Sequence, residues 1–356
     1  MSKRSQMSAS ELSTVVLDYV KHDGACAAGI ATLETLEGGP PSSDITYVLP
    51  GARSAISFAV PLDTEKIESF LRKESQSDHE SDNRLVNIIV SGIAAQLAAY
   101  LDGIDHPSYA VVANAVYRTD VPHGRRALIP ELSHRYMAVA SGVGWFGFSG
   151  NVITPSHGAS VILGTVVTTA ELEPTPHLDP EERYCDECHL CLASCNSKLM
   201  STEESATVTF GGSEFGYSKR KTYQRCELVC GGFTGLNTKG KWSTWSPARF
   251  PIPENDDGFR EVLIETVNAR AKRPEPEGGF YHPLFPKGER IEITCGNCQL
   301  ICNPDKDERK RRYRLLTQSG VVIEHPDGNL AAVSPEVAAK HLEAMTPEER
   351  SAFERT

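Results

Sequence analysis

The chain has 356 residues, a formal net charge of −11 and 40% hydrophobic residues, which is ordinary for a soluble globular protein of one large or two smaller domains. The negative charge argues against general nucleic-acid binding through a basic surface. The apolar run at 88–101 is too short to span a bilayer, and the N-terminus shows no hydrophobic leader or twin-arginine pair, so we expect a cytoplasmic protein without membrane contact.

Helices and strands are both predicted in the first 175 residues. Leu12, Val16 and Val20 share one helical face, and apolar residues recur at helical spacing again in a long helix that begins near Leu85. The charged, serine-rich residues 73–84 before it are expected to form an exposed linker. In chain order we predict helix 11–21, strand 26–32, strand 55–60, the long helix, strand 109–117, helix 131–141 and a hairpin over 152–169.

These elements do not alternate as they would in a doubly wound parallel sheet, so we predict an α+β fold for residues 1–175. Pro174, Pro176 and Pro180 mark its end.

The second half of the chain shows weaker signals. The stretches 200–235 and 239–288 are rich in glycine, proline and polar residues, with one predicted helix at 257–271. A basic run at 306–314 is interpreted either as a solvated helix face or as a docking patch for an anionic partner. The last predicted helix opens with a capping box of Thr346 and Glu349.

Nine of the ten cysteines lie beyond residue 184. Four of them form a C-x2-C-x2-C-x3-C run: Cys185, Cys188, Cys191 and Cys195. Bacterial two-cluster ferredoxins bind iron–sulfur clusters by such a run, whose fourth cysteine ligates the other cluster. A C-x2-C-x3-C group and two further cysteines supply the remaining ligands: Cys295, Cys298 and Cys302, preceded by Cys226 and Cys230. The sequence therefore predicts two [4Fe-4S] clusters.

Two other uses of these cysteines fit less well. Structural zinc sites normally combine two C-x2-C pairs, or cysteines with a histidine pair, at finger-like spacing. Disulfides need an oxidising compartment. Cys26 stands apart from the group and is expected to be a small buried hydrophobe.

With these residues in view, the chain resembles the cobalamin-dependent iron–sulfur reductases, the group of epoxyqueuosine reductase and the reductive dehalogenases. The stretch from Gly142 to Gly147, Gly-Val-Gly-Trp-Phe-Gly, is similar to the family's Gly-Leu-Gly-Trp-Ile-Gly. The segment 294–304 is similar to the family's second cysteine motif, and Arg225-Cys226 to its isolated Arg-Cys.

The resemblance implies a domain plan. It implies a nitroreductase-like, corrinoid-binding α+β domain over 1–175 and a ferredoxin-like two-cluster module over 176–305. The span between Cys230 and Cys295 is longer than in epoxyqueuosine reductase, which suggests an inserted lid at about 231–290, and residues 306–356 are predicted to form a helical tail. Aromatic residues of the insert are interpreted either as a substrate-site lining or as an apolar satellite cluster: Trp242, Trp245, Phe250, Phe280, Tyr281 and His282.

The resemblance also implies ligand sets. The first cluster takes Cys185, Cys188, Cys191 and Cys302. The second takes Cys195, Cys226, Cys295 and Cys298, with Cys230 as the surplus thiol or an alternative to Cys226. A base-off corrinoid without a protein ligand is implied, with contacts from Gly142, Gly144, Trp145, Gly147, Asn151 and Gly158. A flavin in the same domain is the other cofactor we consider.

The chain departs from the family at the proton donor. The family's acidic residue matches about Ala127 and Leu128, ahead of Pro130, and neither can give a proton. Reductive dehalogenases use a tyrosine beside a basic residue, and Arg125, Arg126 and Arg135 are the basic residues available for that part. Our candidates for the donor are Tyr117, Asp120 and Tyr136.

The resulting hypothesis is a cobalamin-dependent iron–sulfur oxidoreductase that reduces an organic substrate by two electrons, similar to epoxyqueuosine reductase. Its expected partners are a small-molecule or modified-base substrate and a reduced ferredoxin or flavodoxin; nucleic acid is not expected, but tRNA is left open. The alternatives are a reductive dehalogenase of a small organohalide and a two-cluster electron carrier without chemistry of its own.

Overall fold

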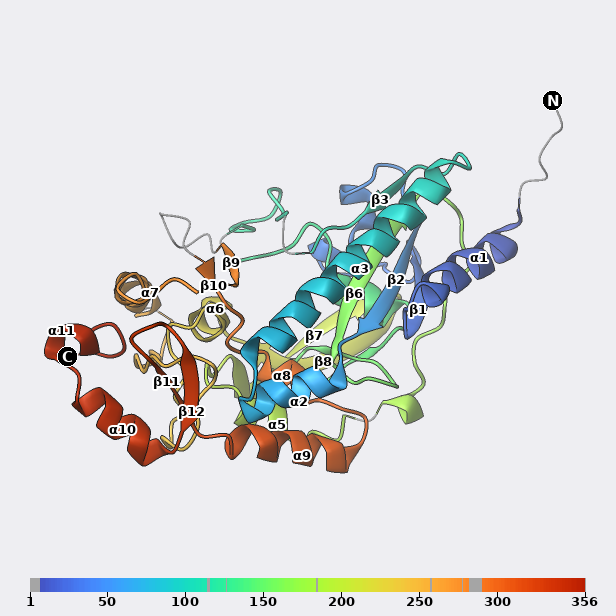
Figure 1. Ribbon diagram of the computed structural model, residues 1–356. Coiled ribbons are helices and arrows are strands. Elements are labelled where there is room, and N and C mark those ends of the chain that lie inside the picture. Colours follow the sequence, from blue (N-terminus) through green and yellow to red (C-terminus); the bar gives the residue numbers. More distant parts are fainter. Residues whose placement is uncertain are drawn as a thin grey trace. The chain divides into compact units, whose positions relative to one another are not determined.

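The computed structural model describes residues 7–113, 116–125, 127–183, 185–256, 258–276, 278–281 and 290–355. The chain is a mixed α+β protein, as predicted (Figure 1). It divides into two compact units. The first comprises the residues up to 62 together with 83–188 and 204–218, and the second comprises 63–82, 189–203 and 219–356.

The first unit is built on a four-stranded antiparallel sheet in the order β1-β2-β6-β3. The central strands β2 and β6 are buried along nearly their whole length, as an apolar core strand requires. Its elements are α1 (Ala9–His22), β1 (Ala27–Thr32), β2 (Ser54–Pro61), most of α3 (Gln76–Asp102), β3 (Ser108–Ala110), α4 (His134–Ala140), β4 (Trp145–Phe146), β5 (Val152–Ile153) and β6 (Val161–Thr168), with short 3-10 turns at Pro41–Ser43, Ile45–Tyr47 and Pro180–Glu182.

The predicted N-terminal helix is confirmed as α1, and its start is fixed by a capping box. Ser8 accepts from the backbone of Glu11, whose carboxylate accepts from the backbone of Ser8 in return. The predicted strands 26–32 and 55–60 are confirmed as β1 and β2.

The hairpin predicted over 152–169 is wrong. Strand β5 pairs with β4, and β6 joins the larger sheet between β2 and β3. The turn itself exists, since Thr154 and Gly158 form a bridge, but the two strands diverge after it. Of the strand predicted at 109–117, the structure describes all residues except 114 and 115, and among these Tyr109 and Ala110 lie in β3.

Helix α3 is the one helix among the described residues that is long and apolar enough to cross a membrane, by length and composition alone. Its residues Val90, Ile93 and Leu97 are buried at helical spacing, the pattern of a helix that packs one face against a core. Tyr19 of α1 donates to Gln96 at 3.2 Å and stacks on Tyr100. Core helices pass the same composition test, so α3 is weak evidence for a membrane segment.

The second unit contains mostly short helices and two-stranded sheets. Its elements are α2 (Thr64–Arg72), α5 (Leu190–Ala193), α6 (Gln224–Cys230), α7 (Phe259–Arg270), β9 (Phe280–Tyr281), β10 (Arg290–Ile291), α8 (Asn297–Leu300), α9 (Lys306–Thr317), β11 (Val321–Glu324), β12 (Leu330–Val333), α10 (Pro335–Glu343) and α11 (Pro347–Arg350). The capping box predicted at Thr346 and Glu349 is confirmed.

The exposed linker predicted at 73–84 is wrong. Helix α3 already starts at Gln76, and five polar residues of this segment are buried: Lys73, Gln76, His79, Glu80 and Asp82. Four of them, Lys73, Gln76, Glu80 and Asp82, hydrogen-bond within the second unit. Gln76 Nε2 donates to the Ile293 carbonyl at 2.9 Å, and Asp82 accepts from the Asp63 amide at 2.9 Å.

Two hairpins were not predicted. Strands β7 (Met200–Phe210) and β8 (Ser213–Arg220) form a two-stranded sheet, and β11 pairs with β12. Gly211 and Gly212 join β7 to β8 with φ of +57° and +75°, the signature of a two-residue hairpin turn. This Gly-Gly pair was the available signal, and the polar composition of the strands hid it.

Candidate metal centre

Five cysteine thiols from three separate segments meet in the second unit. Cys226 and Cys230 lie on α6 with their Sγ atoms 3.4 Å apart, and Cys230 also hydrogen-bonds with Cys295. Cys298 interacts electrostatically with Cys195, Cys226 and Cys295. Cys195 thus lies close to the downstream cysteines, and its assignment to the second cluster stays a prediction.

Buried polar side chains hold these segments together. Thr294 Oγ1 donates to the Val229 carbonyl at 2.6 Å, which ties the downstream cysteine segment to the end of α6. Asn196 Nδ2 donates to the Gly235 carbonyl at 2.6 Å, and Asn297 Nδ2 donates to the Ser194 carbonyl at 3.4 Å. The Asn196 amide thus fixes the residue that directly follows the last cysteine of the run.

The thiols have shifted pKa values. Burial raises the pKa of Cys195 and of Cys298. Hydrogen bonding with Cys226 and Cys295 raises the pKa of Cys230, and the hydrogen bond from Cys230 lowers the pKa of Cys295 to about 7. Burial disfavours a thiolate unless a cation lies beside it.

The donor set fits an iron–sulfur cluster. Soft thiolates are the ligands of such clusters, and a [4Fe-4S] cluster takes four of them, one on each iron. Across the described ranges, no three cysteine, histidine or acidic side chains are arranged to hold a single metal ion.

The remaining cysteines fall in both units. Cys185 and Cys188 belong to the first unit, where the Phe148 amide donates to Cys185 Sγ at 3.3 Å and Cys188 is exposed. Cys191 lies on α5 and Cys302 follows α8, and these two helices pack together in the second unit. The first ligand set stays a prediction.

The basic run on α9 is divided between the two sides of the helix, since Arg309 and Arg312 are buried while Lys306, Lys310 and Arg314 are exposed. Arg312 is 2% exposed, and its Nη1 donates to the Leu300 carbonyl at 2.9 Å. Arg309 Nη1 donates to the Asn303 carbonyl at 2.9 Å. These two arginines hold the carbonyl groups of the segment that carries Cys298 and Cys302.

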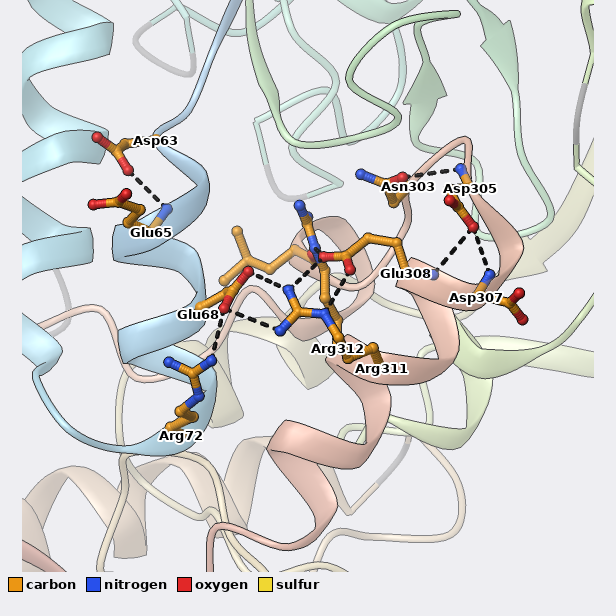
Figure 2. Close-up of polar contacts among 11 residues, drawn as sticks. Asp63, Glu65, Glu68, Arg72, Asn303, Asp305, Asp307, Glu308, Arg311 and Arg312 are labelled. Atoms are coloured by element: carbon orange, nitrogen blue, oxygen red, sulfur yellow. Dashed lines mark hydrogen bonds and ion pairs between the residues drawn. The ribbon is translucent and has the colours of Figure 1, made fainter.

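A charged network links α9 to α2 (Figure 2). Arg311 pairs with Glu68 of α2, and Glu308 accepts from Arg312 Nε at 2.7 Å. Arg72 donates to Glu68 at 2.7 Å. Each arginine thus has a carboxylate or carbonyl partner within the second unit.

The glycine stretch of the first unit is explained by contacts within the chain. A Cβ on Gly144 would lie 2.4 Å from Val152 Cγ1, and one on Gly147 would lie 2.2 Å from Ile153 Cδ1. The Gly147 amide donates to the Asn151 carbonyl at 3.0 Å, closing the turn between β4 and β5. Gly142 and Gly158 take φ of +72° and +62° at turns.

Trp145, in the same turn, packs against the chain as well. Its ring centroid is 4.7 Å from that of Phe215, and Arg183 Cζ lies 3.2 Å from the Trp145 centroid. Gly147 and Asn151 thus lie in the turn between β4 and β5, and packing within the chain accounts for Gly144, Trp145 and Gly147. The corrinoid contacts stay a prediction.

The three predicted proton donors lie in different settings. Tyr136 on α4 is half-buried against Phe146 and Phe210, with Arg135 Cζ 5.7 Å from its ring centroid. Asp120 is exposed and bonded to Arg118, which lowers the pKa of its carboxyl. Tyr117 forms an isolated bridge with Pro130. Arg126, the basic residue beside Arg125, lies outside the described residues.

The sequence pattern did not point to Glu131, a buried acidic residue in the same segment. Glu131 is 7% exposed and accepts from Tyr109 Oη at 3.0 Å. Burial, followed by this hydrogen bond, raises the pKa of Tyr109. Glu131 directly follows Pro130, whereas the resemblance directed attention to the positions before that proline.

The aromatic residues of the insert are packed. Trp242, Trp245 and Phe250 are 4%, 5% and 3% exposed. Trp245 Nε1 donates to the Phe70 carbonyl at 2.9 Å, and Phe250 packs in a small apolar cluster. The satellite-cluster interpretation therefore holds for these three, while His282 and the side chains of Phe280 and Tyr281 lie outside the described residues.

Comparisons with known proteins point in one direction. No protein-family model matches the chain. An epoxyqueuosine reductase from Gloeobacter violaceus is 30% identical over 172 residues, which cover 48% of this chain and 49% of that protein. The chain thus spans about half the length of that curated relative.

Solved structures add the fold. A structure of a reductive dehalogenase, described as suggesting a mechanism for B12-dependent dehalogenation, aligns with a TM-score of 0.50 at 13% identity. The alignment covers 99% of this chain and 39% of that one, so the likeness concerns the fold alone. An epoxyqueuosine reductase with a modified tRNA stem loop aligns over 95% of this chain and 74% of that one at 16% identity, with a TM-score of 0.43, which says nothing about substrate.

Proposed function

We propose that this chain belongs to the superfamily of epoxyqueuosine reductases and reductive dehalogenases, and that it is a cytoplasmic, corrinoid-dependent iron–sulfur oxidoreductase that reduces an organic substrate by two electrons. The observation that carries the proposal is the meeting of Cys195, Cys226, Cys230, Cys295 and Cys298 in the second unit. Five thiols brought together from distant segments suit electron transfer chemistry better than a packing role.

The domain plan follows the family. We propose a nitroreductase-like domain over 1–175, a two-cluster module over 176–305 with an insert at about 231–290, and a helical tail over 306–356. The likeness in fold to a reductive dehalogenase, which covers 99% of this chain, supports this plan. Cys185, Cys188, Cys191 and Cys302 hold the first cluster in it, and four of the five thiols hold the second.

The chain's own contribution to catalysis is binding, orientation and proton delivery. A corrinoid, when bound, would supply a low-valent cobalt centre for two-electron reduction. The corrinoid is proposed from the resemblance to the family alone, because packing within the chain already explains Gly142, Gly144 and Gly147. Tyr136 is the favoured proton donor, since Arg135 lies beside it as the tyrosine interpretation requires. Asp120 is disfavoured, because its bond to Arg118 keeps the carboxyl ionised.

The proposed substrate is an epoxyqueuosine-type modified base, after the named activity of the curated relatives. A small organohalide is the second candidate, since the chain also shares the fold of a reductive dehalogenase. Electrons would come from a reduced ferredoxin or flavodoxin. Because this chain has a net charge of −11, that donor would have to dock through a surface that complements an acidic partner.

A single-turnover assay tests this function. Protein purified without oxygen and supplied with cobalamin is reduced chemically and mixed with tRNA carrying epoxyqueuosine, with the free nucleoside, or with a bromophenol. Formation of queuosine supports the proposal. Comparing the reaction of the tRNA with that of the free nucleoside shows whether tRNA is required. Bromide release without queuosine formation favours the dehalogenase. Reoxidation without any product contradicts both and leaves an electron carrier.

A further inference from the structure

Helix α3 has an apolar face that the fold leaves exposed. Its inner face packs on the core of the first unit, whereas Leu85, Ile88 and Ile89 are 52%, 68% and 36% exposed. These three side chains lie at i, i+3 and i+4, so they are neighbours on the helix surface. Gly92 follows on the same side, and a Cβ there would meet no atom within 4 Å. The patch therefore continues along the helix without a packing partner.

The exposed face also lacks charge. Residues 85–101 contain no Asp, Glu, Lys or Arg, although about five turns of helix are involved. A surface helix of a soluble protein normally presents charged side chains to water. Single exposed hydrophobic residues are common on protein surfaces, but a contiguous exposed patch indicates an interaction site. This side of α3 is thus a candidate for contact with a partner.

The patch has a bulky half and a small half. The bulky half consists of the three aliphatic side chains near its N-terminal end. Toward the C-terminal end the exposed residues are Ala95, Gln96 and Ala99. Ala95 and Ala99 are four residues apart and lie on one side of the helix. One half of the face therefore projects, and the other half is recessed.

This difference in size makes the face complementary to itself. In two copies of α3 that pack antiparallel about a two-fold axis at Gly92, Leu85 of one copy lies opposite Ala99 of the other. Ile89 lies opposite Ala95 of the other copy in the same way. Large side chains then fill the space above small ones, as in well-packed helix pairs. Such a two-fold contact uses one patch twice, which is the commonest way in which proteins form dimers.

The charges at the two ends fit the same arrangement. Arg84 precedes the patch and Asp102 follows it, and both are exposed. The Asp102 carboxylate accepts from the Ser108 amide at 2.8 Å, which holds it at the end of the helix. Arg84 and Asp102 are about 27 Å apart along one helix, so they do not pair within a chain. Antiparallel packing brings Arg84 of each copy to Asp102 of the other, whereas parallel packing would bring like charges together.

A membrane surface fits this face less well. Helices that lie on membranes carry several lysines and arginines beside their apolar side. Arg84 is the one basic residue between 83 and 105, and the whole chain has a net charge of −11. The alanines of the small half also offer little apolar area to lipid.

We propose that the exposed face of α3 binds a second copy of this chain, antiparallel and about a two-fold axis at Gly92. The stretch 85–99 spans about 21 Å, which places the contact at the low end of the size range of specific interfaces. The dimer should therefore dissociate in about the micromolar range. This contact needs neither a cluster nor a corrinoid, so it is independent of the proposed function.

The test is sedimentation velocity of the full chain, purified without oxygen, from about 1 to about 200 µM. Ile88→Glu places a charge in the bulky half, and Ala95→Trp fills the small half. Both residues are exposed in the single chain, so both variants should fold. Ile264→Glu is the matched control, since Ile264 is 55% exposed on α7 of the second unit.

We expect the wild-type protein and Ile264→Glu to dimerise with the same dissociation constant. Ile88→Glu should raise that constant about tenfold or more, because a carboxylate would be buried without a partner. Ala95→Trp should raise it by about as much, because the indole would overlap Ile89 of the second copy.

The end charges give a separate test of the antiparallel orientation. Arg84→Asp and Asp102→Arg should each weaken the dimer, and the two changes together should restore it, because the pair forms again between the two copies. Equal weakening in the combined variant would contradict the antiparallel arrangement.

Three results would overturn the inference. The first is a wild-type protein that stays monomeric up to about 200 µM. The second is tighter association of Ala95→Trp, since added apolar area strengthens an unspecific contact but blocks this one. The third is binding of the monomer to phosphatidylglycerol vesicles that Ile88→Glu abolishes, which would assign the face to a membrane.

Discussion

The two regions that the sequence singled out behave differently in the structure. In the second unit, cysteines that are a hundred residues apart in the chain meet. In the first unit, the glycine stretch folds into one turn, and contacts with Val152 and Ile153 account for its glycines. Cysteine spacing is thus evidence for a site, whereas a glycine motif is first evidence for a tight turn.

The largest effect is expected from the cysteine group. Cys295→Ala removes one of the five thiols that meet in the second unit. The second cluster should then not assemble, and iron should fall from about eight to about four per chain. Anaerobic iron and sulfide analysis measures this, with Cys26→Ala as the control. Retention of full iron content would show that the group does not hold a cluster.

A large effect on turnover is expected from Tyr136. Tyr136→Phe removes the proposed proton donor, and general acids contribute roughly 100-fold or more to rate. The single-turnover rate should fall accordingly while iron content stays constant. Tyr117→Phe is the matched control, and an equal loss in both variants would argue against Tyr136 as the donor.

The arginines of α9 test whether the basic run supports the cysteine segment. Arg312→Leu leaves the Leu300 carbonyl unpaired, which should cost about 1–3 kcal/mol in the free energy of unfolding. Urea unfolding measures this, and bleaching of the cluster absorbance in air should also become faster. Lys310→Ala, at an exposed position on the same helix, should change stability by less than about 1 kcal/mol.

Glycine substitutions test the packing explanation in the first unit. Gly144→Ala places a Cβ against Val152 and the Ile153 carbonyl, which should destabilise the fold by about 1–3 kcal/mol. Gly92→Ala on α3 meets no atom within 4 Å and should be neutral or stabilising by up to about 1 kcal/mol. Thermal unfolding compares the two, and equal melting temperatures would contradict the packing explanation.

The smallest effect concerns pH and involves one histidine in each unit. Burial lowers the pKa of His134 and of His79 to about 4. The unfolded chain binds these protons near pH 6.5 and the folded chain does not, so stability is lost as pH falls below 6.5. Each histidine should cost about 1 kcal/mol between pH 7.5 and 5.5 in urea unfolding. His134→Gln should flatten the profile; an unchanged profile would mean that the folded protein accepts the proton.

The sequence predicted the parts in which local pattern and chemistry agree. Helix α1, strands β1 and β2 and the cap at Thr346 follow from periodicity and capping residues. The prediction of an exposed linker at 73–84 is wrong because its polar side chains bond to residues far along the chain, as Gln76 does to Ile293. Local composition does not predict contacts between distant residues. The burial of Glu131 could not be predicted for the same reason, since its partner Tyr109 lies 22 residues away in the sequence.

The most direct test of the account is the content of iron, acid-labile sulfide and cobalt in the wild-type protein, purified without oxygen from cells supplied with cobalamin. The account predicts about eight irons and eight sulfides per chain, with about one cobalt. Eight irons without cobalt would retain the thiol group as a cluster site and remove the corrinoid. Zinc in place of iron would contradict the central claim, that the five thiols of the second unit are built around an iron–sulfur cluster.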